Sequence, residues 1–116
     1  MPNWCHNRVS IYCEDERVLD EIEEIFTSPE PFNAIMPLPK EEEENWYNWR
    51  MENWGVKWDI SEVDSDKFHD RLILEFETPW GAPEGIKSRL EDIYGDEDIG
   101  ISWFYDEPMM ELAGYL

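Results

Sequence analysis

Apolar and polar residues alternate in four short segments of the chain, which is the pattern of a half-buried β-strand. In the clearest segment Leu72, Leu74 and Phe76 share one face of the strand. The four segments are residues 7–13, 56–60, 71–77 and 99–105. Residues 64–70 are rich in turn-forming side chains and predict a connection.

A helical period appears in two further segments. In residues 14–26 the apolar side chains recur every three to four positions, and the opposite face is almost wholly acidic. Residues 83–95 repeat the spacing, with Pro83 suited to a first helical turn and Gly95 to the end. Two amphipathic helices are therefore expected.

The predicted order is strand, helix, strand, strand, helix, strand. This order is typical of a split βαβ, or ferredoxin-like, α+β fold, in which two helices cover one face of an antiparallel sheet. Residues 27–55 are expected to be an insertion after the first helix, with a proline-rich extended loop over residues 29–39. A chain of 116 residues without repeats predicts a single domain, residues 1–116.

The chain carries 29 Asp and Glu residues against 9 Lys and Arg residues, a net charge of −20. Its 41% hydrophobic content, with 7 Trp, 5 Tyr and 5 Phe, is that of a folded domain rather than of a disordered acidic tail. Such a surface favours a basic partner and opposes direct binding of nucleic acid.

The tryptophans of residues 46–58 have two interpretations. Trp46, Trp49, Trp54 and Trp58 alternate with Arg50 and Lys57, as in a platform that stacks single-stranded bases. Such a platform needs a positive groove, and acidic residues surround these two cations. Aromatic packing of the insertion against the sheet is the favoured interpretation.

Three segments resemble a known family: MPNWCHN at residues 1–7, ENWGVKWD at residues 52–59, and FETPW at residues 76–80 followed by Pro83. They are similar to the YubB-like family of small proteins carried by phages and plasmids, whose members contain a ferredoxin-like domain. Pro79 and Gly81 depart from the pattern, where Ala and Ser-Pro variants are expected. The resemblance implies a fold and a mobile-element origin, and it implies no catalytic residues.

The charge also suggests mimicry of DNA. Twenty charges correspond to about 34 Å of duplex, and a compact domain of this length has a diameter of order 35 Å. Phage or plasmid origin favours an inhibitor that occupies the DNA channel of a host defence protein, whereas solvation is the plainer use of an acidic surface. The predicted partner-binding rows are Glu16, Asp20, Glu23, Glu24, Glu41, Glu42, Glu43 and Glu44.

The alternative function is a small enzyme or ligand-binding module. Its pocket would lie between the Trp-rich insertion and the sheet and would be lined by Trp54, Lys57, Trp58 and His6. No catalytic motif is present, and a Lys lying over a Trp face is the simpler role for Lys57. A homo-oligomer joined through an open sheet edge is a third prediction.

No metal or other cofactor is predicted. Cys5, His6, Cys13 and His69 lack the spacing of a zinc site. The acidic runs at residues 64–66 and 96–98 do not fit a calcium loop. On one strand the two cysteines would be roughly 26 Å apart, too far for a disulfide, so we expect free thiols and a cytoplasmic protein.

Overall fold

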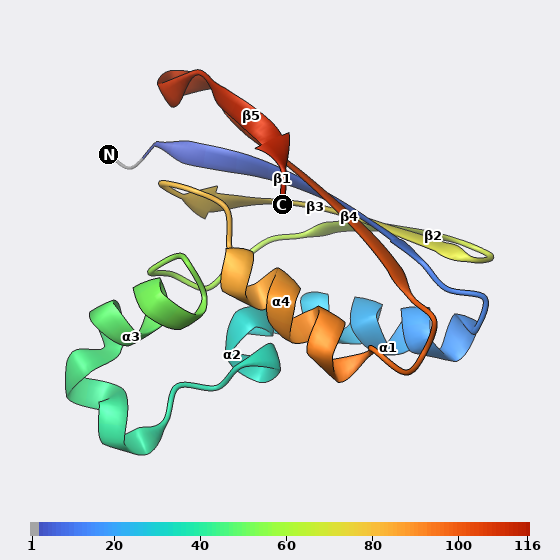
Figure 1. Ribbon diagram of the computed structural model, residues 1–116, viewed down its shortest axis with the longest axis horizontal. Coiled ribbons are helices and arrows are strands. Elements are labelled where there is room, and N and C mark those ends of the chain that lie inside the picture. The colour runs from blue at the N-terminus through green and yellow to red at the C-terminus, as the bar shows by residue number, and fades with distance from the viewer. Residues whose placement is uncertain (1–2) are drawn as a thin grey trace.

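The computed structural model describes residues 3–116, which form an antiparallel sheet with the helices along one side of it (Figure 1). Residues 1 and 2, the start of the predicted domain and of the first family-like segment, lie outside the described residues. The strands are β1 (Trp4–Tyr12), β2 (Asp64–Phe68), β3 (Arg71–Pro79), β4 (Gly100–Glu107) and β5 (Leu112–Tyr115). Their order across the sheet is β2-β3-β1-β4-β5.

The helices complete an α+β architecture, which confirms the predicted class and the antiparallel sheet. The α-helices are α1 (Glu16–Phe26), α2 (Pro31–Ile35), α3 (Trp46–Asn53) and α4 (Glu84–Ile93). The 3-10 helices are η1 (Lys40–Asn45) and η2 (Pro108–Met110). Among residues 3–116 no helix is long and apolar enough to cross a membrane.

The core lies between the sheet and the helices. On β1, Val9 and Ile11 are fully buried, while Arg8 and Tyr12 at alternate positions are exposed, as expected for a strand covered on one face. The helical side chains in this core include Leu19, Ile22 and Phe26 from α1 and Ile86 and Leu90 from α4. Each such side chain contributes about 1.5–3 kcal/mol of burial free energy.

Trp54 attaches the insertion to this core. Its side chain is fully buried, and its Nε1 donates a hydrogen bond to the Met36 carbonyl at 2.8 Å. Its ring packs edge-on against Phe32, whose ring in turn meets Phe76 of β3. The packing interpretation is therefore confirmed for Trp54, whereas Trp58 remains exposed.

Residues 56–60 do not form the predicted strand. Val56 and Ile60 are buried, but they belong to a loop that follows α3. The Asp59 carboxylate of this loop accepts hydrogen bonds from the backbone N–H groups of Phe32 and Asn33, both at 2.9 Å, in the first turn of α2. The loop is thus bound to α2 rather than to a strand, and its alternation reflects packing alone.

The strand expected at residues 56–60 is instead β2, within the segment predicted to be a connection. Its sequence, DSDKF, has no apolar alternation, because β2 pairs only with β3 at the edge of the sheet. Five further elements were not predicted: α2, η1 and α3 in the insertion, and η2 and β5 after β4. The short helix α2 starts at Pro31 inside the expected extended loop, and β5 follows η2 at the other edge of the sheet.

Candidate functional site

The first predicted acidic row lies on α1, where the buried apolar stripe directs the carboxylates outward. Glu16, Asp20 and Glu24 are exposed and Glu23 is half-buried. Lys67 on β2 forms an ion pair with Asp20. We refer to Glu16, Asp20, Glu23 and Glu24 as the α1 acidic group.

The second predicted row lies on η1, a 3-10 helix with no buried residue. Pro39, in extended backbone, directly precedes this helix. We refer to Glu41, Glu42, Glu43 and Glu44 as the η1 acidic group. Within residues 3–116 none of the four forms an ion pair.

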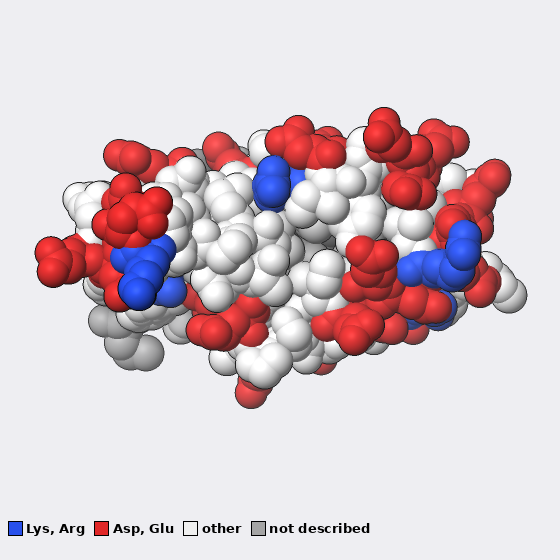
Figure 2. Space-filling view, turned by 90° about the horizontal axis from the view of Figure 1, so that it is seen from below, with Lys and Arg blue, Asp and Glu red and all other residues white. Residues whose placement is uncertain are grey.

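The two acidic groups do not form one continuous stripe. α1 and η1 lie toward opposite ends of the long axis of the molecule (Figure 1). Viewed from the helix side, acidic side chains gather at both ends and along the edges of the face, around an uncharged area near its middle (Figure 2). The helix side therefore presents separated negative regions with a neutral surface between them.

The four residues predicted to share a pocket are not brought together. Trp54 is fully buried and fills the core, which corrects its assignment to a pocket lining. Lys57 Nζ lies 4.6 Å from the centre of the Trp58 ring, as expected for a cation over an indole face. Trp58 also meets Trp4, with ring centres 6.4 Å apart. His6 lies on the exposed side of β1.

His6 instead lines a groove at the edge of β3, with a volume of about 510 Å³. We call it the β3-edge groove. Its lining comes from the start of β1, the segment 61–64 that leads into β2, and the second half of β3. The lining residues are Trp4, His6, Ser61, Glu62, Val63, Asp64, Glu75, Phe76 and Glu77.

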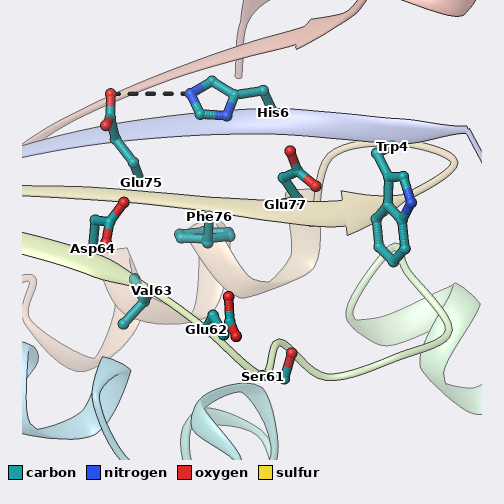
Figure 3. A pocket seen from close by; sticks show the side chains of 9 residues that line it. All are labelled: Trp4, His6, Ser61, Glu62, Val63, Asp64, Glu75, Phe76 and Glu77. Carbon is teal, nitrogen blue, oxygen red and sulfur yellow. Dashed lines mark ion pairs between the residues drawn. The ribbon is translucent and has the colours of Figure 1, made fainter.

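The groove has aromatic and acidic walls (Figure 3). Trp4 lies at one end and Asp64 at the other, with the Phe76 ring between them. Glu77 on β3 and Glu62 on the preceding segment lie on either side of that ring. The groove thus combines aromatic side chains with carboxylates from both of its walls.

Little positive charge balances these carboxylates. Glu75 lies 3.6 Å from an Arg8 nitrogen and 4.0 Å from Nε2 of His6. Within residues 3–116, Glu62, Asp64 and Glu77 form no ion pair. The side chains of this part of the chain also contain no group of three His, Cys, Asp or Glu arranged to hold a metal ion.

A buried polar cluster lies on the helix side of the same strands. Asn7 donates a hydrogen bond to Thr78 Oγ1 at 2.9 Å and accepts one from Trp103 Nε1 at 2.9 Å, so the buried amide is satisfied. Burial of Cys5, reinforced by the negative charge of Glu107, raises the pKa of its thiol to about 11. The thiol stays protonated near neutral pH and is not a ready nucleophile.

Several groove residues were not predicted as site residues. Glu75 and Glu77 occupy the polar positions of the strand pattern at residues 71–77, so their shared face could have been recognised. The sequence could not show that they share a groove with Trp4 and Glu62, because the groove is formed by three distant segments. The second strand was also expected at residues 56–60.

Comparisons with known proteins support only the fold. The sequence matches no family model, and no curated protein matches it. The chain is similar to the crystal structure of a protein api92 from Yersinia pseudotuberculosis, which is described by the family-model name DUF1281, with a TM-score of 0.62 and 19% identity. The similarity covers 72% of this chain and 34% of that one, so the chain spans about a third of that protein's length.

Proposed function

We propose that this chain is a non-catalytic acidic interaction protein that binds a basic, nucleic-acid-binding surface of a host protein. The observation that carries the proposal is the pair of α1 and η1 acidic groups, separated by a neutral area on the helix side (Figure 2). Apart from Asp20, none of their carboxylates forms an ion pair within residues 3–116. These charges are available to cations of a partner.

The arrangement supports mimicry of DNA charge. In duplex DNA two negatively charged backbones flank a groove about 12 Å wide, and the groove floor carries no net charge. The longest extent of this protein is 40 Å, and its net charge of −20 equals that of about 34 Å of duplex. A protein surface that binds duplex phosphates would therefore meet a similar density of charge.

The proposal includes a phage or plasmid origin and an anti-defence role, such as inhibition of a DNA-binding nuclease. We also infer a YubB-like protein with a ferredoxin-like fold. Supporting this are the three family-like segments, the antiparallel order β2-β3-β1-β4 and the helices on one side of the sheet (Figure 1). The free, buried thiols Cys5 and Cys13 are consistent with a cytoplasmic location.

The test is retention of proteins from a bacterial lysate on the immobilised chain. A retained partner should elute as NaCl rises from 0.05 to about 0.5 M, because exposed charge pairs are screened. It should also elute with a short DNA duplex, which would compete for the same basic surface. Elution by neither salt nor duplex would contradict the proposal.

A matched pair of charge-reversal variants identifies which surface of the protein binds the partner. Glu23→Lys with Glu24→Lys changes the α1 acidic group. Asp66→Lys with Asp70→Lys makes the same charge change on β2 and on the turn that follows it. The α1 reversal should reduce retention by about tenfold and the control by less than about twofold. Equal losses would show a response to net charge alone and would contradict binding through the helix side.

A further inference from the structure

At the β3-edge groove, the end of β3 extends beyond its pairing with β2. β2 pairs with β3 only as far as Asp64, opposite Glu75, so residues 76–79 of β3 have no strand on that side. The Trp80 N–H donates toward β1, to the Asn3 carbonyl at 2.8 Å. Because backbone groups alternate in direction along a strand, the N–H and C=O of Glu77 point to the groove side.

A backbone edge of this kind accepts an added strand. Phe76 and Glu77 line the groove, whereas Thr78 and Pro79 are buried and lie outside its lining. The open edge is therefore short and centred on the backbone of Glu77, which suits a segment of a few residues. The groove volume of about 510 Å³ lies within the range of binding pockets. The geometry therefore suits a short extended peptide.

The charges of the groove select the side chains of such a peptide. Glu62, Asp64 and Glu77 lack ion pairs within residues 3–116, and no Lys or Arg lines the groove. Trp4 at one end is 43% exposed, and an indole face attracts a guanidinium group by cation–π interaction. Arginine meets both features, because its planar fork also binds carboxylates bidentately.

We propose that the β3-edge groove binds an extended, arginine-containing peptide segment of a protein partner as a short strand added to β3. Backbone hydrogen bonds to Glu77 would set the register. Carboxylates on either side would hold an arginine, and Trp4 would cover its guanidinium. The site uses the sheet edge and not the α1 and η1 acidic groups, so it goes beyond the function proposed above and stands without it.

The direct test uses a fluorescent nine-residue peptide of alternating Arg and Val, with binding followed by anisotropy at 0.15 M NaCl. Glu62→Gln with Glu77→Gln should weaken binding about tenfold, since two exposed carboxylates of the groove are lost. Glu41→Gln with Glu43→Gln removes the same charge from η1 and should weaken binding less than about twofold. Equal weakening in the two variants would overturn the groove as the site.

A second probe separates strand addition from charge attraction. The same peptide with N-methyl groups on alternate residues keeps every arginine but loses backbone donors, and it should bind about fivefold more weakly. When the unmethylated peptide is bound, the backbone amide of Glu77 in the protein should gain the largest protection from hydrogen exchange among residues 76–79. Unchanged affinity of the methylated peptide, or no protection of Glu77, would overturn strand addition.

The groove proposal and the helix-side proposal can be tested independently of each other. The variant with Glu23→Lys and Glu24→Lys should bind the peptide within about twofold of the original chain, because those residues lie on α1. A large loss in that variant would contradict the groove as an independent site. Peptide binding without lysate retention would leave the groove standing and remove the helix-side proposal.

Discussion

At the scale of single residues, Asp59 connects a loop to a helix. Its Oδ1 accepts from the N–H groups of Phe32 and Ile60 and its Oδ2 from that of Asn33, all at 2.9 Å. Burial raises the pKa of the Asp59 carboxyl, and the three backbone donors offset part of this rise. The side chain thus satisfies N–H groups at the start of α2 that no helical carbonyl can reach.

Asp59→Ala should lower the free energy of unfolding by about 1–3 kcal/mol, because backbone donors lose a charged acceptor. Asp59→Asn retains one side-chain oxygen and should cost less. Urea denaturation followed by tryptophan fluorescence measures both values. Asp66→Ala, at an exposed position on β2, is the control and should stay within about 0.5 kcal/mol. An Asp59→Ala cost no larger than that of the control would contradict the capping role.

Cys5 predicts a pH dependence. Its folded-state pKa of about 11 lies above the ordinary value of 9.0, so the native state holds the proton longer than the unfolded chain. The free energy of unfolding should therefore fall as pH rises from about 9 to about 11. Urea midpoints across this range should decline more steeply for the original chain than for Cys5→Ala. Parallel declines would contradict the raised pKa.

At the scale of elements, the end of α3 and the start of α4 meet through backbone. The Gly85 N–H donates to the Trp54 carbonyl at 3.1 Å. A Cβ added at Gly85 would lie 1.5 Å from the Asn53 carbonyl oxygen. This contact leaves no room for a side chain, and it places the Trp-rich insertion against α4.

Gly85→Ala should lower the free energy of unfolding by about 2–3 kcal/mol, because the backbones of α3 and α4 must separate. Gly81→Ala is a matched control, since its added Cβ meets no atom within 4 Å. Thermal unfolding of both variants measures the difference. Similar melting temperatures would show that the junction is loose.

The sequence predicted those elements whose apolar pattern is set by contact with the core. β1, β3, β4, α1 and α4 each bury one regular face, and each was expected near its observed position. β2 was missed because an edge strand with polar residues on both faces has no such pattern. Residues 56–60 gave the opposite error, since Val56 and Ile60 reach the core from a loop.

The candidate sites differ in the same way: the sequence pattern predicts one of them and not the other. Exposure of the α1 acidic group follows from the helical period, because the buried stripe determines the opposite face. The β3-edge groove depends on where β2 stops pairing with β3, and no apolar alternation in the sequence marks that position. Trp54 was placed in a pocket because an aromatic run does not reveal which ring enters the core.

At the scale of the whole molecule, the net charge of −20 acts over distances set by salt. The Debye length is about 30 Å at 0.01 M and about 8 Å at 0.15 M ionic strength. The longest extent of the protein is 40 Å. At low salt the α1 and η1 acidic groups therefore repel each other across the molecule, and at physiological salt repulsion is confined to each group.

Raising NaCl from 0.01 to 0.15 M should increase the free energy of unfolding, by of order 1 kcal/mol, because screening relieves repulsion that is stronger in the compact state. Urea denaturation at each salt concentration measures this gain. A variant with Gln at all four positions of the η1 acidic group should gain less, since its compact state begins with less repulsion. If the variant gained as much as the original chain, the η1 carboxylates would not contribute to the repulsion that destabilises the folded state.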